Sequence, residues 1–477
     1  MESFLYRFRP IENLIGTDNI KSELLNHYVY FSSPKQLNAP LEGHREIFWN
    51  GDEVVWKNLF RHYIKTLILR NAQYFSEDFA KSEFPILPEF ERLSRKPLET
   101  VNKLVNEFSS TSQVKTLIRL LKDRKVGKNE LLLILRSLHL YAMHLTSKLL
   151  VELGAIQKGY GINGEDPKNF LKAPELLIDY YNPISSKDDI NSYISDEDIV
   201  TIQSCDLIAN YNEWKKDTSK NWITLSINFP QDYLDSIPSL CMPPWYAACF
   251  MEACSDSSLW GTYGNNHQGV CLKFKIKGNL KDSTMEFMTP LKRPGDIKWW
   301  QRTDLKIMKV KYSSETPNLD FFRTIRAYSY KNLLKEWYKD ENGSLSECHN
   351  SVFNDYEQWG RKSEEDFIQS VTSKTWHWDK ETEYRILFTS KTLEQLTPEE
   401  RSLQYDFKDL QGIIFGIRTP SEKKYQIIEI LIELCEKYSR QEFDIYQAYY
   451  DKACDCIRYN TIAKIKLNNG EAKIEEP

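Results

Sequence analysis

Apolar side chains along this chain follow two different spacings. In residues 4–8, 384–388 and 412–416 they fall in short β-prone runs, in which successive side chains point to opposite faces of a sheet. Between about residues 53 and 211 they recur every three or four positions, which is typical of amphipathic helices. The pattern therefore predicts an α+β protein.

The helical stretch lies between two β-prone regions, so we expect a discontinuous domain. Residues 1–50 and 220–477 are predicted to form a core with a mixed or antiparallel sheet. Residues 51–219 are predicted to form a large inserted helical lobe. Within the core, the run at residues 222–227 is expected to begin the second β region as a strand.

Composition and charge exclude several classes of protein. The chain has 63 Lys and Arg against 68 Asp and Glu, a formal charge of -5, so no overall field attracts nucleic acid or an anionic membrane. Its most apolar stretch, residues 131–156, carries several charged and histidine side chains and is not expected to span a bilayer. The first residues lack the features of a secretory signal, which predicts a cytoplasmic protein.

The nine cysteines show no regular framework. Disulfides are not expected, because an odd, scattered set is typical of a reducing compartment. Structural zinc usually requires two close pairs such as Cys-x-x-Cys, and the sequence has none. We therefore predict no metal site.

Two carboxylates mark the most promising chemistry. Glu381 and Glu383 stand at the mouth of a predicted strand, where alternation places them on one face with Arg385. Carboxylates held beside aromatic rings can be partly desolvated, as acid/base and cation-stabilising groups must be. The alternative is a solvated strand edge with an ordinary Glu–Arg pair.

A second candidate group lies in a glycine-rich stretch ahead of a predicted strand. Trp260 and Tyr263 are three residues apart and project from one side of a short helix, and His267 follows in the tight entry to the strand. Core packing explains Trp260 well. Tyr263 and His267 are candidates for lining a ligand site.

Residues 292–311 form the most basic stretch of the chain. They contain seven Lys or Arg against two acids, with Trp299 and Trp300 among them. Charge and stacking surfaces together can bind a phosphate-bearing ligand or a nucleic acid. A solvated strand pair with half-buried tryptophans is the alternative.

Five segments, in this order, resemble the bacterial family catalogued as domain of unknown function 2971. They are residues 5–9, 30–40, 248–250 with 259–274, 376–387, and 412–416. In that family the second segment usually reads Phe-Asn-Asp-Pro, whereas here it reads Leu37-Asn38-Ala39-Pro40. The second and third segments are also usually closer together, which supports an inserted helical lobe. The change at Ala39 matters if the family's aspartate contributes to activity.

The order of these residues is also similar, more loosely, to the layout of ADP-ribosyltransferase folds. In those folds a first-strand residue holds the ribose or phosphate of NAD, a tyrosine stacks on nicotinamide, and a glutamate stabilises the positive charge that develops as the glycosidic bond breaks. The similarity implies that Arg7 or Arg9, Tyr263, and Glu381 or Glu383 take these roles. It also implies a set of cofactor-binding candidates, which are Tyr6, Arg7, Arg9, Asn38, Trp260, His267 and Arg385.

Three hypotheses remain open. The first is an NAD-dependent ADP-ribosyltransferase or NAD glycohydrolase that serves as an intracellular toxin or antiviral defence effector and uses NAD as substrate. The second is a nucleic-acid-binding or nuclease-type defence protein that uses residues 292–311. The third is a non-catalytic ligand sensor or scaffold. A small nucleotide is the expected ligand class. The sequence carries no signal for the acceptor, the trigger or the oligomeric state.

Overall fold

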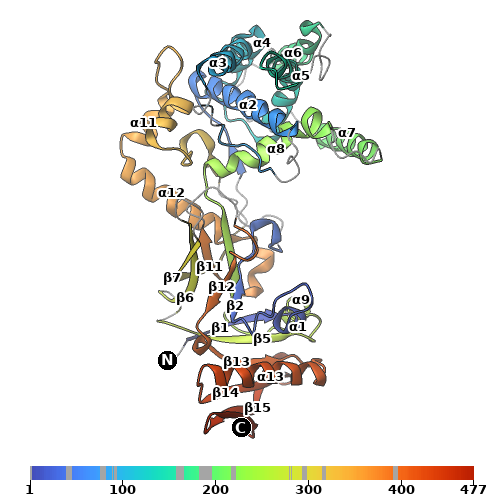
Figure 1. The fold of residues 1–477 in the computed structure, drawn as a ribbon, viewed down its shortest axis with the longest axis vertical. Coiled ribbons are helices and arrows are strands. Elements are labelled where there is room, and N and C mark those ends of the chain that lie inside the picture. Colours follow the sequence, from blue (N-terminus) through green and yellow to red (C-terminus); the bar gives the residue numbers. More distant parts are fainter. Residues whose placement is uncertain are drawn as a thin grey trace. The chain divides into compact units, whose positions relative to one another are not determined.

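The protein is described by a computed structural model. Most of the chain is described, namely residues 3–38, 46–75, 82–88, 90, 94–156, 166–181, 196–215, 222–278, 280, 282–292, 298–313, 318–389 and 396–477. Helices and a large, mostly antiparallel sheet make up the fold (Figure 1), which confirms the α+β class.

The chain divides into two compact units. The core unit comprises Met1–His44, Pro243–Thr316 and Ile368–Pro477, and the helical unit comprises Arg45–Met242 and Pro317–Phe367. The sequence pattern placed the helical lobe at residues 51–219 only. Residues 317–367 join it because their apolar side chains, such as Phe321, Phe322 and Trp337, belong to the same hydrophobic cluster as α2.

The core unit is built on one sheet of twelve strands, in the order β16-β15-β14-β13-β5-β1-β4-β11-β7-β6-β12-β2. Neighbouring strands are antiparallel except β13 and β14, which are parallel. The strands of this sheet are β1 (Ser3–Arg9), β2 (Tyr28–Tyr30), β4 (Trp245–Met251), β5 (Val270–Ile276), β6 (Thr284–Lys292), β7 (Lys298–Lys309), β11 (Glu383–Thr389), β12 (Ser402–Tyr405), β13 (Leu410–Phe415), β14 (Glu442–Asp451), β15 (Cys456–Asn468) and β16 (Glu471–Glu475).

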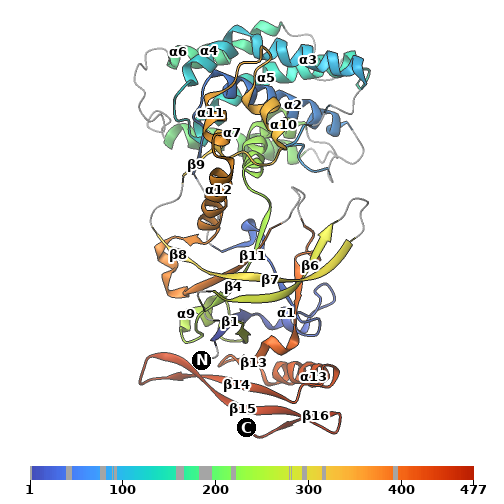
Figure 2. The same cartoon turned by 90° about the vertical axis from the view of Figure 1, so that its left-hand side faces the viewer.

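Short elements connect these strands and cover the sheet. The longest is α13 (Ser421–Lys437), which lies beside β13 and β14 in both views (Figure 2) and buries Ile427, Leu431 and Leu434 at helical spacing. The others are α1 (Ile11–Ile15), η1 (Pro34–Gln36), α9 (Ser257–Thr262), β8 (Lys311–Tyr312), β10 (Ser373–Lys374), η9 (Trp376–Glu381) and η10 (Phe407–Asp409).

The helical unit packs around two long central helices. Asp52 caps α2 by accepting hydrogen bonds from the N–H groups of Val54 and Val55. Both α2 and α5 bury side chains around most of their circumference, as expected of helices inside a bundle. Its helices are α2 (Glu53–Tyr74), α3 (Arg95–Ser110), α4 (Ser112–Leu121), α5 (Lys128–Glu152), η3 (Pro167–Leu171), α6 (Lys172–Tyr181), α7 (Asp196–Trp214), η5 (Thr224–Asn228), α8 (Phe229–Ser236), η6 (Ile237–Leu240), η7 (Phe321–Arg323), α10 (Tyr330–Leu333), η8 (Leu334–Tyr338) and α11 (Glu347–Phe353).

Two further elements complete the chain. A short parallel pair, β3 (Glu46–Phe48) with β9 (Asn318–Asp320), belongs to the helical unit and draws its two sequence segments together. Helix α12 (Tyr356–Val371) begins in the helical unit and ends in the core unit.

Two sequence-based expectations are wrong. Residues 222–227 form no strand. Most of this run belongs to the π-helix η5, which α8 follows, and Leu225 and Phe229 lie in the apolar centre of the helical unit. Burial among helices overrides the β propensity of this run. Cys454 and Cys456 form a disulfide at the turn between β14 and β15, although no disulfide was expected.

No helix in the described part of the chain combines the length and apolarity needed to cross a bilayer.

Candidate functional site

A cavity of about 190 Å³ opens in the core unit where β1 and β4 part. These two strands pair at Tyr6 and Met251, whereas β1 pairs with β5 along its whole length. The cavity is lined by residues of β1, β4, the segment after β2, the end of α9, β10 and β11: Tyr6, Arg7, Phe8, Arg9, Ser32, Gln36, Leu37, Asn38, Ala247, Cys249, Met251, Tyr263, Lys374 and Glu383.

Arg7 bridges the gap between the parting strands. Its guanidinium donates to the backbone carbonyls of Cys249 at 2.9 Å and Tyr30 at 3.1 Å, which lie at the ends of the gap. Its Nε has no hydrogen-bond partner among the described residues. Burial, with the charge of Arg9 nearby, lowers the pKa of Arg7 to about 10, so the group is still a cation at neutral pH.

Arg9 supplies a second positive charge at the same cavity. Its Nε donates to Glu23 Oε2 at 2.7 Å, and its Nη2 also contacts the second oxygen of that carboxylate. Such a two-point pair fixes the guanidinium plane. The carboxylate of Glu23 pairs with Arg9 and offsets one of the two positive charges that Arg7 and Arg9 bring to this wall of the cavity.

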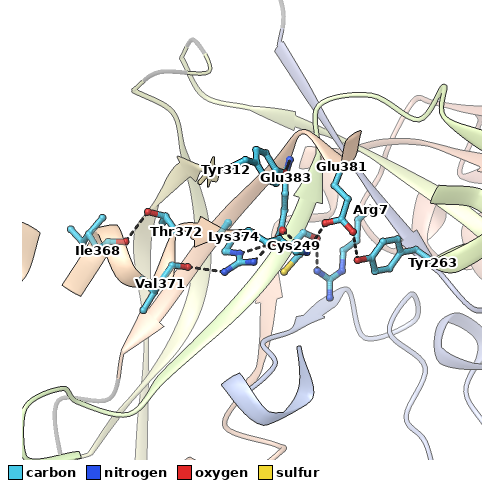
Figure 3. A network of polar contacts seen from close by, with 11 residues as sticks. Arg7, Cys249, Tyr263, Tyr312, Ile368, Val371, Thr372, Lys374, Glu381 and Glu383 are labelled. Carbon is cyan, nitrogen blue, oxygen red and sulfur yellow. Dashed lines mark hydrogen bonds and ion pairs between the residues drawn. The ribbon is translucent and has the colours of Figure 1, made fainter. Parts of the chain in front are cut away.

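Glu383 is held as a buried anion. The side chain is 1% exposed, and its oxygens accept hydrogen bonds from Arg385 at 2.7 and 3.1 Å. Lys374 donates a further hydrogen bond at 3.2 Å (Figure 3). Burial alone would raise the pKa of Glu383, but the charge and hydrogen bonds of Arg385, with those of Lys374 and the Cys249 thiol, lower it to about 2. Glu383 is therefore ionised at every physiological pH.

Glu381 behaves differently although it is two residues away. It accepts hydrogen bonds from the Tyr263 hydroxyl at 2.6 Å and from Lys374 Nζ at 2.6 Å. Burial raises its pKa above the ordinary range, and the positive charge of Lys374 only partly offsets this. Burial also raises the pKa of Tyr263, so the phenol keeps its proton and remains a donor.

A left-handed residue explains how two neighbouring glutamates meet different partners. Glu381 ends the 3-10 helix η9, Thr382 follows with a φ of 42°, and Glu383 begins β11. The expectation that both carboxylates lie on one strand with Arg385 is therefore correct for Glu383 and wrong for Glu381. Figure 3 shows Glu381 directed toward Tyr263 and Glu383 directed toward Lys374 and Cys249.

Tyr312 holds the start of β11 in place. Its hydroxyl accepts the backbone N–H of Glu383 at 2.9 Å, and β8 pairs in parallel with β10, which sets Lys374 opposite Tyr312. Lys374 Nζ also lies 4.5 Å from the ring centre of Trp378. The positive charges of Lys374 and Arg385 thus balance the negative charges of Glu381 and Glu383 within one buried network.

Trp260 and His267 shape the loop that carries Tyr263. The indole N–H of Trp260 donates to the Cys254 carbonyl, and the ring packs edge-on against Phe8. His267 adopts a left-handed φ of 67°, and its backbone bonds to Trp260 and Arg418. Neither side chain lines the cavity.

The structure brings together six of the residues that the sequence singled out. The cavity is lined by Tyr6, Arg7, Arg9, Asn38, Tyr263 and Glu383. Glu381 and Arg385 do not line it but contact residues that do. Ala39 lies outside the described residues. The binding and catalytic roles of all these residues stay predictions.

Lys374 and Cys249 were missed by the sequence reasoning. Lys374 belongs to a strand of two residues, so no periodicity announces it, and its importance comes from contacts with Glu381 and Glu383. Cys249 lay within a segment that was recognised, yet nothing in the sequence marked its thiol as a neighbour of Glu383.

The basic stretch at residues 292–311 meets carboxylates in the structure. Arg302 pairs with Glu286 at 2.7 Å, and Lys309 pairs with Glu252 at 3.1 Å. Trp299 and Trp300 are 53% and 43% exposed. Residues 293–297 lie outside the described part of the chain. Nucleic-acid binding here stays a prediction, with stacking surfaces available but part of the positive charge neutralised.

Within the described ranges, no group of three or more His, Cys, Asp or Glu side chains is arranged to hold a metal ion.

Comparison with known proteins supports the family resemblance over part of the chain. Residues 259–386 match the family model described as Protein of unknown function (DUF2971). The matched segment includes Tyr263, Lys374, Glu381 and Glu383. Comparisons with curated proteins and with solved structures gave no match.

Proposed function

We propose that the core unit binds NAD and cleaves the bond between nicotinamide and ribose. The C1′–N bond breaks, nicotinamide leaves with the electron pair, and the ribose carbon takes an oxygen from water or an acceptor group, which releases its proton. The protein would thus be an NAD glycohydrolase or an ADP-ribosyltransferase. One observation carries the proposal: two arginines, a tyrosine and a buried anionic glutamate converge on one cavity.

Charge supports this assignment. The breaking bond leaves positive charge on the ribose, and a fixed carboxylate that is already ionised stabilises that charge without reorganising. Glu383 is such a group, because its pKa of about 2 keeps it anionic. Arg7 and Arg9 provide the positive wall that a diphosphate requires.

Tyr263 would contact the nicotinamide, and Glu381 would hold Tyr263 in position. The Tyr263 ring lines the cavity and offers a face to the nicotinamide cation. Glu381 holds the Tyr263 hydroxyl and fixes the ring orientation. Glu381 does not line the cavity, so we propose that it positions Tyr263 and does not itself take a proton from the attacking water or acceptor.

The cavity volume limits how much of the ligand it encloses. Sites for small molecules usually span about 300–1,000 Å³, and this cavity has about 190 Å³. It therefore suits the nicotinamide and its ribose. The rest of NAD would extend past Arg9 toward Asn38 and Gln36, at the more exposed end of the lining residues.

The test measures nicotinamide release from NAD by the full chain, together with NAD affinity by calorimetry. Glu383→Gln removes the charge and keeps the shape, and we expect it to lower the rate of release on the order of 10²- to 10³-fold. Glu130→Gln is the matched control, because Glu130 is also a buried glutamate paired with an arginine, Arg124, but lies in the helical unit. It should leave release unchanged.

Two results would overturn the proposal. One is wild-type protein that neither releases nicotinamide nor binds NAD saturably. The other is an equal loss of activity in Glu383→Gln and Glu130→Gln, which would assign both effects to folding. In cells, a toxin or defence effector of this kind should lower NAD levels or label an acceptor, and Glu383→Gln should abolish the effect.

A non-catalytic nucleotide sensor is the second candidate, and one observation favours it. Both glutamates already have cationic or phenolic partners, as structural ion pairs do. Saturable NAD binding with no nicotinamide release, in the presence of cell extract as a source of activator, would support the sensor over the enzyme.

A further inference from the structure

The disulfide at the turn between β14 and β15 closes a very small loop. Cys454 and Cys456 are bonded with only Asp455 between them. Cys456 is the first residue of β15, and Cys454 lies in the turn that follows the end of β14 at Asp451. A disulfide stabilises a fold mainly by closing a long loop in the unfolded chain, so a loop of this length contributes the least. The bond is therefore a poor structural staple.

The hairpin is held in register by other contacts. Antiparallel pairing with β15 runs along the whole length of β14 (Figure 2). The Asp451 carboxylate pairs with Arg458 at 3.1 Å and accepts the N–H of Ala453 at 2.9 Å. The N–H of Ile457 donates to the Ser255 carbonyl at 2.8 Å, which ties the start of β15 to the segment before α9. Opening the disulfide would thus leave the hairpin in place.

Access to solvent separates this pair from most of the other cysteines. Cys454 is exposed and Cys456 is half-buried. Five of the seven remaining cysteines are buried, namely Cys241, Cys254, Cys271, Cys348 and Cys435. Exchange requires a thiolate to reach one sulfur of the bond, so access decides which sulfur is attacked. The Sγ of Cys454 is the one open to attack, and the Sγ of Cys456 is then the leaving group.

The charges beside the bond balance. Between residues 450 and 458 the acids are Asp451 and Asp455, and the bases are Lys452 and Arg458. The Asp455 carboxylate also accepts a hydrogen bond from the Tyr450 hydroxyl. This segment therefore presents no excess of negative charge to a small anionic thiol, and its own charges do not repel the attacking group.

We propose that Cys454 and Cys456 form a reversible thiol–disulfide exchange site for a small-molecule thiol. The thiolate attacks Cys454 Sγ, the bond between the two cysteines breaks, and its electron pair stays on Cys456 Sγ, which takes a proton from water. A second thiolate attacks the sulfur of the bound thiol, and Cys454 Sγ leaves with the electron pair and is protonated. Two small thiols are thereby oxidised to their disulfide, and the protein disulfide is reduced to two thiols.

The exchange site is separate from the cavity proposed to bind NAD. Neither cysteine lines that cavity. Exposed disulfides are the ones that exchange readily, whereas structural bridges resist reduction by glutathione. Reversible opening by glutathione, with the fold unchanged, is therefore the property that distinguishes an exchange site from a structural bridge.

The experiment equilibrates the full chain in mixtures of glutathione and glutathione disulfide. The Cys205→Ser background removes a second exposed thiol, which would otherwise take up glutathione. After acid quenching and alkylation, peptide mass spectrometry counts the free thiols at positions 454 and 456. We expect both thiols to appear together as glutathione increases and to disappear when glutathione disulfide is restored. Circular dichroism should be the same in the two states.

Single and double variants identify the attacked sulfur. Cys456→Ser removes the resolving thiol, so reaction with glutathione disulfide should stop at a mixed disulfide on Cys454. Cys454→Ser is the matched variant and should form its mixed disulfide more slowly, because Cys456 is less exposed. The variant with both substitutions should lose the reversible change in thiol count completely while keeping its fold.

Three results would overturn the inference. The first is a bond that stays closed in excess glutathione while the chain is folded, as a structural bridge would. The second is unfolding of the chain when the bond is reduced. The third is a pair of thiols that stays open in excess glutathione disulfide. Nicotinamide release is measured separately, so the exchange site and the proposed NAD activity can fail independently.

Discussion

The two units of this protein bury polar groups differently. The core unit gathers several charges in one network, whereas the helical unit buries Glu130 with Arg124 and two neutral histidines. In the core unit, Glu383, Arg385 and Lys374 are buried as charges, each paired with an opposite charge. In the helical unit, His62 and His139 are buried as neutral rings, hydrogen-bonded to tyrosine hydroxyls and backbone carbonyls. Charges held in place by partners can stabilise a charge that develops in a reaction, whereas the ring nitrogens of His62 and His139 are already occupied by hydrogen bonds.

This difference favours different functions for the two units. A buried charge network is expensive to build and is tolerated where its field is used. Among the described residues, the helical unit also leaves several buried polar atoms without a hydrogen bond, including the indole N–H groups of Trp49 and Trp56 and the hydroxyl of Thr66. The contrast favours chemistry in the core unit.

The largest expected effect comes from removing one partner of the core network. Glu383→Ala leaves Arg385 and Lys374 buried without their carboxylate, and we expect it to lower the free energy of unfolding by about 3–5 kcal/mol. Chemical denaturation measures this. Glu475→Ala removes an exposed partner of Lys466 in the same sheet and should change stability little. Similar stability of the two variants would contradict the buried network.

Lowering the pH should weaken the helical unit before the core unit. Burial lowers the pKa of His62 to about 3 and of His139 to about 4, from an ordinary value of 6.5. Their contribution to stability is complete above pH 6.5 and is lost as the pH falls toward those values, about 2 kcal/mol per histidine by pH 5. Burial raises the pKa of Asp320, so this group favours the folded state as the pH falls. It opposes the effect of the two histidines but does not outweigh it.

The core unit should respond less over the same range, because its groups act in both directions. Burial also lowers the pKa of His27 and of His267, which weakens this unit as the pH falls. Glu383 contributes fully above pH 4.5 and loses its contribution only as the pH falls toward 2. Glu381 and Asp409 have raised pKa values, so they favour the folded state more as the pH falls. Hydrogen exchange followed by mass spectrometry from pH 7 to 5 separates the units. Faster opening of the core unit than of the helical unit would break the comparison.

Two substitutions of Tyr263 separate the role of its ring from that of its hydroxyl, with smaller expected effects on stability and NAD affinity. Tyr263→Phe removes the hydrogen bond to Glu381 and should cost about 1 kcal/mol of stability, with NAD affinity retained. Tyr263→Leu also removes the aromatic face and should weaken NAD binding further. Calorimetry compares the two variants. Equal NAD affinity in the Tyr263→Phe and Tyr263→Leu variants would contradict stacking of the Tyr263 ring on nicotinamide.

The smallest effect is expected at the exposed tryptophans. Trp299→Ala and Trp300→Ala should change stability by less than about 0.5 kcal/mol, because both side chains are largely exposed. Binding of single-stranded nucleic acid, measured at two salt concentrations, tests the alternative function. Salt-dependent binding that these variants abolish would favour it over chemistry at the cavity.

Much of the fold was predictable because local pattern and final structure agree. The strand expected at residues 4–8 is β1, the helical periodicity that begins near residue 53 corresponds to α2, and the pairing of Glu383 with Arg385 follows from strand alternation. In each case the signal is carried by neighbours in sequence.

What could not be predicted depends on contacts between distant segments. Lys374 matters because two short strands place it beside two glutamates. Trp260 was expected near the ligand, yet its side chain is turned into the core against Phe8. The run at residues 222–227 became helical because its neighbours are helices. Spacing alone contains none of this information.

The most direct test of the central claim is a crystal structure of the Glu383→Gln variant with NAD bound. The account predicts nicotinamide against the Tyr263 ring, the ribose facing the side chain at position 383, and the diphosphate at Arg7 and Arg9. A cavity that stays empty at saturating NAD, or NAD bound elsewhere on the protein, would contradict it.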